Sequence, residues 1–382
     1  MEKSKVYFTD FHCTQRQSRL SKLRNLINRA GMGEIDFKDK FVAVKIHFGE
    51  FGNLGFIRHQ YAKVVCDYIK ERGGKPFLTD ASTLYIGARN NAVDHLENAF
   101  LNGFNPLSTG VPTIIADGLR GTDERIIKVK GAKHCKEARI ASAIAEADIL
   151  ISMTHTKGHQ VAGYGGTLKN IGMGCGSRQG KMEMHSSDTP MILKKRCIGC
   201  GQCAEHCDHN CIRIVKGTAV VNEKNCVGCG YCFCYCPKGA IHCKWDEAPS
   251  VMVEKVAEYT KAAIGDKPAF HINFVTNVTK HCDCKPSNDV SIIPDIGMFA
   301  SFDPIALDQA CVDAINASPI FEDSELGTAA KEAGETAENG IIAAGEGHNV
   351  FKMVHPDTNW EAGLAHGEKL GLGTRNYELK KK

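Results

Sequence analysis

Residues 197–237 read CIGCGQCAEHCDHNCIRIVKGTAVVNEKNCVGCGYCFCYCP and contain the pattern C-x2-C-x2-C-x3-C twice. Each cysteine of the second copy lies 29 residues after its counterpart in the first, a regularity that chance rarely produces. The eight cysteines are Cys197, Cys200, Cys203 and Cys207 in the first copy, and Cys226, Cys229, Cys232 and Cys236 in the second. We interpret the rest of the chain as built around this repeat.

This spacing is typical of iron–sulfur chemistry. Three cysteines separated by two residues place three thiolates in one tight loop, where they can bind three irons of a cubic cluster, and the fourth thiolate comes from elsewhere in the fold. The repeat therefore predicts two [4Fe-4S] clusters. Zinc or disulfides are the alternatives, but zinc sites use paired C-x2-C units rather than a third cysteine two residues further on.

Residues 190–245 resemble a bacterial dicluster ferredoxin, and the resemblance implies that the fourth ligands are exchanged between the two copies. One cluster would then be held by Cys197, Cys200, Cys203 and Cys236, and the other by Cys226, Cys229, Cys232 and Cys207. Asp208 departs from the pattern, because the second copy has Pro237 at that place. Between the copies, residues 212–221 carry apolar residues on both sides of a Lys-Gly turn, which predicts a short hairpin.

The composition is that of a globular protein of 382 residues, with 43% hydrophobic and 24% charged residues. Eighteen cysteines without an apolar N-terminal leader predict a reducing cytoplasm. No apolar run approaches the roughly 20 residues that a membrane-spanning helix needs. The formal net charge is +3, which eight thiolates and two oxidised cluster cores would bring to about −1. The Lys and Arg residues are scattered, which argues against nucleic-acid binding.

The flanking sequence alternates short apolar runs with helical patterns, which predicts an α/β domain with a parallel or mixed, doubly wound sheet. The predicted strands are residues 41–48, 75–80, 113–117, 148–155, 269–279 and 290–295. The predicted helices are residues 18–30, 57–72, 86–102, 136–147, 249–265 and 304–316. Because the alternation resumes after the repeat, we expect a small α+β dicluster ferredoxin module at residues 188–246, inserted between two parts of the α/β domain, residues 1–187 and 247–382.

Ligands of open parallel sheets bind beyond the carboxyl ends of the strands, and here those ends carry His, Asp and Cys residues. Residues 154–176 are the densest such stretch. The candidate catalytic residues are His155, Lys157, His159 and Lys169, and the candidate cofactor-binding residues are Gly163, Gly165 and Gly166. Glycines let backbone amides approach an anion closely, and lysines add positive charge. A structural Gly-rich turn is the alternative, and the stretch does not match the phosphate-loop pattern.

Cys282 and Cys284 flank Asp283 at the end of a predicted strand. On an extended chain both thiols would point to one side and Asp283 to the other. We therefore expect the pair to bind an additional metal in the crevice, such as zinc or iron, with His281, His155 or His47 completing the site. Packing of two small buried side chains is the alternative.

Six stretches spread over nearly the full length are KIHFGE at 45–50, FLTDASTLY at 77–85, ADGLRG at 116–121, HTKGH with GYGGTLKNIGMG at 155–174, CDC at 282–284 and DIGMFASFDPIALDQA at 295–310. Together they resemble the domain of unknown function 362 family, in the form that carries a ferredoxin insert. The resemblance implies the architecture and brings no activity with it. A more distant similarity, in residue types of the His-rich and Lys-bearing site, is to the nickel-pincer lactate racemase.

These observations predict a cytoplasmic iron–sulfur protein of an anaerobe that binds two [4Fe-4S] clusters and transfers electrons to a substrate or second cofactor in the α/β crevice. It would then be an oxidoreductase with a redox partner protein or a small-molecule substrate, and without nucleic-acid or membrane partners. A non-catalytic ferredoxin-like electron carrier is one alternative. A metal-dependent lyase or isomerase with structural clusters is the other. The oligomeric state is not predicted.

Overall fold

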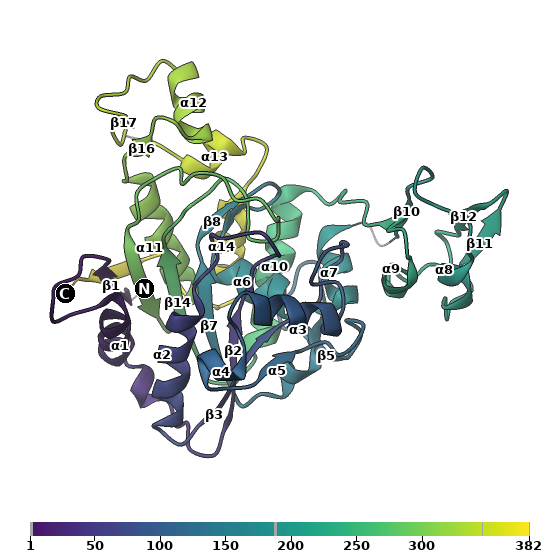
Figure 1. The fold of residues 1–382 in the computed structure, drawn as a ribbon, viewed down its shortest axis with the longest axis horizontal. Coiled ribbons are helices and arrows are strands. Elements are labelled where there is room, and N and C mark those ends of the chain that lie inside the picture. The colour runs from purple at the N-terminus through teal and green to yellow at the C-terminus, as the bar shows by residue number, and fades with distance from the viewer. Residues whose placement is uncertain (1–2, 187–188, 346, 382) are drawn as a thin grey trace.

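The computed structural model describes residues 3–186, 189–345 and 347–381. Its centre is an eight-stranded sheet with the strand order β18-β1-β15-β14-β7-β2-β3-β4 (Figure 1). The strands are β1 (Ser4–Asp10), β2 (Phe41–Ile46), β3 (Lys75–Asp80), β4 (Thr113–Ile115), β7 (Ile149–His155), β14 (Ala269–Val275), β15 (Gly297–Ser301) and β18 (Tyr377–Lys380). All neighbours pair in parallel except β15, which runs antiparallel to both β14 and β1. The predicted α/β class with a mostly parallel sheet is confirmed.

The central strands are apolar along their length because helices cover both faces of the sheet. In β2, Val42 and Val44 belong to the core on one face and Ala43 to the core on the other. The first core packs under α1 (Arg19–Arg29) and α2 (His59–Lys70). The second face is covered by α6 (Thr167–Cys175) and α11 (Pro304–Asn316), behind which lie α10 (Pro249–Ile264) and α14 (Trp360–Lys369). A three-layer arrangement results.

Local signals account for several of the helix ends. The Ser18 side chain accepts a hydrogen bond from the Ser21 amide at the start of α1. Asp303 caps α11 and is followed by a proline at the first helical position. Gly265 ends α10 with a φ of 55°, which glycine adopts without strain.

The other elements are shorter and lie around the edges. They are α3 (Ala92–Leu101), α4 (Pro106–Thr109), β5 (Glu124–Lys128), β6 (Glu137–Ala141), α5 (Ser142–Glu146), β8 (Lys157–His159), β9 (Gly163–Gly165), α7 (Arg178–His185), β16 (Ile320–Phe321), α12 (Glu325–Glu332), β17 (Ile341–Ile342) and α13 (Val350–Val354), with a 3-10 turn at Met32–Glu34. The last four form a small lobe at the top of Figure 1. Among the described residues, no helix is long and apolar enough to cross a membrane.

The predicted helix at residues 136–147 is wrong. Its first half is strand β6, which pairs antiparallel with β5, and only the second half is the short helix α5. The reason is a two-residue period: Ala138 and Ile140 are buried, whereas Glu137 is exposed and Arg139 is partly exposed. The alanines of this stretch also fit a helical spacing, so the two-residue alternation was not recognised in the sequence.

The predicted strand at residues 290–295 is also wrong, and the strand of that region is β15. Ile292 and Ile293 are adjacent and both buried. Successive side chains of a strand point to opposite faces, so a strand with one face in solvent would bury only one of the two. Pro294 cannot donate to a ladder, and the chain instead turns before β15. The helix predicted from residue 86 begins only at Ala92, and neither β1 nor the edge strand β18 was predicted.

The segment at residues 189–246, called here the Cys-rich module, projects to the right of α7 in Figure 1. It contains β10 (Met191–Ile192), α8 (Gln202–Glu205), β11 (Ile212–Val215), β12 (Thr218–Val221), α9 (Tyr231–Tyr235) and β13 (Ile241–His242). The predicted hairpin is confirmed as β11 and β12, with positive φ angles at Lys216 and Gly217 in its two-residue turn. The central sheet combines strands that precede this module in the sequence with strands that follow it.

Candidate functional site

A cavity of about 710 Å³ opens at the carboxyl ends of β2 and β3, which is the general place for ligand sites in parallel sheets. Its ionisable lining residues are Lys45, His47, Glu50, Asp80, Tyr85, Arg89, His159, Lys169, Lys181, His185, Cys284 and Lys285. Among the described residues, five of these are Lys or Arg and two are Asp or Glu, so the described lining is predominantly basic. Its apolar wall includes Leu84, Ile86 and Trp245, and the last of these comes from the Cys-rich module.

Both carboxylates of the cavity are already paired with cations. Asp80 lies 3.0 Å from the Lys45 ammonium, and Glu50 lies 3.0 Å from the Arg89 guanidinium. Burial alone would raise the pKa of Asp80, but the Lys45 ammonium and neighbouring cations hold it well below its usual range. Asp80 therefore stays ionised and fixes Lys45, so neither acid neutralises the remaining lysines.

Two lysines of the cavity are shifted toward neutrality. Burial, reinforced by the positive charge of Lys157, lowers the pKa of Lys169 to about 7. Burial also lowers the pKa of Lys181 to about 8, although Asp117 opposes the shift. Within the described part of the chain, the Lys169 ammonium has no hydrogen-bond or ion-pair partner. An anionic group in the cavity would supply that partner.

The four predicted catalytic residues separate into two groups. His159 and Lys169 line the cavity. His155 and Lys157 do not line it. His155 Nδ1 lies 2.9 Å from both carboxylate oxygens of Asp283, and the Lys157 ammonium lies 3.1 Å from Asp283 Oδ2. These two residues therefore anchor the loop that carries Asp283.

None of the three predicted cofactor-binding glycines lines the large cavity. Gly166 precedes α6, whose first amides have no cap from that residue. Asp308 of α11 takes this role and accepts hydrogen bonds from the Thr167 and Leu168 amides at 2.7 and 2.9 Å. A Cβ atom at Gly166 would overlap Asp308, so the glycine permits the close approach of α11 to α6. Asp308 thus helps to position the helix that carries Lys169.

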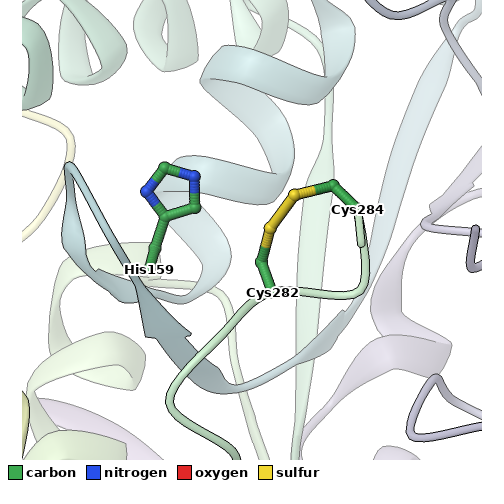
Figure 2. Close-up of side chains that lie close together, drawn as sticks. All are labelled: His159, Cys282 and Cys284. Atoms are coloured by element: carbon green, nitrogen blue, oxygen red, sulfur yellow. A yellow bond between two sulfur atoms is a disulfide. The ribbon is translucent and has the colours of Figure 1, made fainter. Parts of the chain in front are cut away.

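Figure 2 shows the pair Cys282 and Cys284 beside His159. Ligand atoms of the three residues lie within 4.8 Å of one another. The predicted geometry is partly confirmed, because both sulfurs lie together while Asp283 binds His155. That both act as thiolate ligands stays a prediction: with His159 the two cysteines form a group that could hold a metal ion, whereas in the structure their sulfurs form a disulfide, which has no thiolate. The neighbouring histidine is His159 rather than any of the three histidines that were predicted.

The eight repeat cysteines gather around two small cavities of the Cys-rich module. One is lined by Cys197, Cys200, Cys203 and Cys236, and the other by Cys207, Cys226, Cys229 and Cys232 together with Cys211. Backbone amides point at some of the sulfurs: the Ala219 amide lies 3.3 Å from Cys197 Sγ, and the Ala240 amide lies 3.1 Å from Cys236 Sγ. Donors of this kind stabilise thiolates. Each cavity therefore draws cysteines from both copies of the repeat.

The Cys-rich module packs against the wall of the large cavity. Leu84, which lines that cavity, belongs to the same apolar cluster as Cys203 and Cys232. The Trp245 ring lies edge-on to His185, with ring centroids 4.7 Å apart, and both residues line the cavity. One apolar cluster thus reaches from the repeat cysteines to the cavity wall.

Sequence reasoning missed several cavity residues. Lys45 gave a detectable signal, because a lysine in the middle of a buried apolar strand is rare without a partner. Glu50 lies in the KIHFGE stretch, but nothing local indicates its pairing with Arg89, 39 residues further along the chain. Lys181 and His185 lie on α7, which no pattern had singled out.

Residues 42–313 match the sequence profile of a family described as Domain of unknown function (DUF362), which covers more than half of the chain. The chain belongs to this family. No curated protein matches the sequence.

Two solved structures are similar at low identity. The lactate racemase apoprotein from Thermoanaerobacterium thermosaccharolyticum is 13% identical, with 82% of this chain and 57% of that chain covered and a TM-score of 0.40. A protein from Thermotoga maritima is 15% identical, with 80% of this chain and 59% of that chain covered and a TM-score of 0.42. This DUF362 protein therefore spans less than two thirds of the length of either.

Proposed function

We infer that the Cys-rich module binds two [4Fe-4S] clusters and that this DUF362 protein uses them to transfer electrons to an anionic substrate or cofactor in the large cavity. The observation that carries the proposal is the grouping of the repeat cysteines around two separate cavities, each with cysteines from both copies. This grouping agrees with the exchanged fourth ligands implied by the repeat.

The residues around the two cavities fit such clusters in chemical type. Each cavity offers at least four thiol side chains, and apolar neighbours such as Ile212 and Ile241 limit water access. When bound, a [4Fe-4S] cluster supplies one-electron redox chemistry at a potential set by hydrogen bonds and solvent exposure. The amides of Ala219 and Ala240, which point at sulfurs, are groups of the kind that adjust this potential.

The charge of the cavity supports an anionic ligand. Its two described acids pair with Lys45 and Arg89, which leaves three lysines without an acid of the cavity as partner, and Lys169 has no partner at all among the described residues. A carboxylate or phosphate group would bind there through charge-assisted hydrogen bonds. The enclosed apolar wall beside the Cys-rich module would strengthen these interactions by excluding water.

Elemental analysis of anaerobically purified protein tests the proposal. We expect about eight iron and eight sulfide per chain, without stoichiometric zinc. Cys200→Ser should remove about half of the iron, and Cys13→Ser, at an exposed cysteine outside the repeat, should remove none. Zinc in place of iron, or equal iron in the Cys200 variant and the wild type, would contradict the proposal. A further metal in the cavity would favour the metal-dependent lyase or isomerase.

A further inference from the structure

The disulfide between Cys282 and Cys284 lies at the wall of the large cavity. Cys282 is 6% exposed, whereas Cys284 lines the cavity and is only partly buried. This asymmetry gives the pair one sulfur that a ligand can reach and one that it cannot. Only one residue separates the two cysteines, so the bond closes a very short loop. Because disulfides restrict the unfolded chain less as the loop shortens, stabilisation of the fold is a weak reason for it.

His159 lies beside this disulfide, with its ligand atom within 4.8 Å of the sulfurs (Figure 2). Its Nδ1 accepts hydrogen bonds from the Val161 and Ala162 amides at 3.2 and 3.0 Å. Because Nδ1 accepts these hydrogen bonds, the ring proton resides on Nε2. Nε2 is also the ring nitrogen nearer the two sulfurs (Figure 2). An N–H in that place stabilises a thiolate but offers no lone pair to a metal.

The loop that carries the pair is held firmly from the other side. Asp283 pairs with His155 and Lys157, and the Glu50 amide donates to the Asp283 carbonyl at 2.9 Å. Gly158 lets β8 approach this loop, because a Cβ atom there would overlap the Lys280 carbonyl. The two sulfurs can therefore separate or join while the backbone on either side stays in place.

We propose that Cys282 and Cys284 form a redox-active dithiol–disulfide centre that stores two electrons at the cavity. In reduction, the S–S bond breaks and takes up two electrons and two protons to give two thiols. The electrons come one at a time from reduced iron–sulfur clusters, so this source rests on the proposed function, and the protons come from solvent through the cavity. In the reverse step the two thiols give two electrons and two protons to an oxidised anionic substrate and the S–S bond forms again. In reducing compartments, disulfides of this kind are usually catalytic rather than structural.

Alkylation followed by mass spectrometry tests the inference on the full-length, cluster-loaded protein. After mild oxidation with diamide, iodoacetamide should leave the peptide with Cys282 and Cys284 unmodified. After dithiothreitol it should add two groups, and the cycle should be reversible. Two free thiols after diamide, or a disulfide that dithiothreitol cannot reduce in the folded protein, would overturn the inference. Zinc bound stoichiometrically by the reduced wild type but not by Cys282→Ala with Cys284→Ala would also overturn it, in favour of a metal site.

Variants of His159 separate a redox role from packing. His159→Leu removes the N–H group beside the sulfurs and should lower the alkylation rate of reduced Cys284 at neutral pH by roughly tenfold or more, because the reduced thiolate can then no longer accept a hydrogen bond from this ring. His159→Gln keeps an N–H donor and should recover much of that rate. Equal rates in the two variants would overturn the assigned role of His159.

Electron delivery is examined separately. Dithionite should reduce the clusters, which electron paramagnetic resonance monitors. The disulfide should open after the clusters are reduced. A disulfide that opens with dithiothreitol but not after cluster reduction would support the centre itself and count against the proposed electron route.

Discussion

The guanidinium carbon of Arg120 lies 4.4 Å from the centre of the Tyr235 ring. Arg120 belongs to the ADGLRG stretch of the sheet domain and Tyr235 to α9 of the Cys-rich module, one residue before Cys236. The Arg120 carbonyl also accepts a hydrogen bond from the Cys234 thiol at 3.1 Å. This contact therefore joins the loop that follows β4 to the neighbourhood of a predicted cluster ligand.

Removing the Arg120 side chain should loosen the docking of the Cys-rich module without affecting its metal content. A cation–π contact at a partly exposed site contributes about 0.5–1 kcal/mol, so Arg120→Gln should raise local amide hydrogen exchange at the interface about two- to fivefold. Arg125→Gln is the matched control, because Arg125 pairs with Glu146 away from the module. Unchanged exchange in the Arg120 variant, or the same change in both, would show that the contact does not hold the module.

Cys207→Ser should damage the cluster held by Cys226, Cys229 and Cys232, although Cys207 lies in the first copy of the repeat. The expected loss is about four of about eight irons. Cys211 Sγ lies only 3.2 Å from Cys207 Sγ, so Cys211 is placed to substitute as a ligand. The double variant Cys207→Ser with Cys211→Ser is therefore needed beside each single variant. Selective loss of the other cluster, held by Cys197 and its partners, would refute the exchange.

Lys169 should titrate near pH 7, because burial and Lys157 lower its pKa to about 7. Its positive charge is then present below this pH and lost above it, so binding of inorganic phosphate or of a carboxylate should weaken as the pH rises through 7 to 8. Competitive acetylation measured by mass spectrometry reports the midpoint of this single amine. An acetylation midpoint near 10, the value of an ordinary lysine, would contradict the assignment. Lys169→Met should reduce phosphate binding and remove most of its weakening between pH 7 and 8.

Asp308→Ala should destabilise the sheet domain. It removes the acceptor for the Thr167 and Leu168 amides at the start of α6 and for the Asn273 side chain. Buried donors left without an acceptor cost about 1–3 kcal/mol each, so the free energy of unfolding should fall by about 2–5 kcal/mol. Asp308→Asn keeps one acceptor oxygen and should lose less. Urea unfolding followed by circular dichroism makes the comparison, and equal losses in both variants would argue against the capping role.

The parts of the fold that the sequence predicted are those with a strong local pattern. The run FVAVKI of β2 is apolar and β-branched, and α11 carries its own cap in Asp303-Pro304. Strand β1 and the edge strand β18 were missed because their pairing depends on contacts between the two ends of the chain, which no local period records. Residues 137–141 were missed because alanine suits helix and strand patterns alike.

The sequence indicated several residues of the candidate site, but not which of them contact one another. The spacing of the repeat cysteines is a local property and therefore visible in sequence. The pairing of Glu50 with Arg89, and of His155 with Asp283, depends on how the sheet brings distant strand ends together. For the same reason the ion pair between the Lys157 ammonium and Asp283 was not predicted.

The central claim is that the Cys-rich module carries two redox-active [4Fe-4S] clusters. Electron paramagnetic resonance of anaerobically purified, dithionite-reduced protein tests it most directly. The account predicts a signal from two interacting reduced centres, which becomes the simpler signal of one isolated centre when the ligands of one cluster are removed by Cys207→Ser with Cys211→Ser. A protein that shows no signal after reduction and contains no iron would contradict the account.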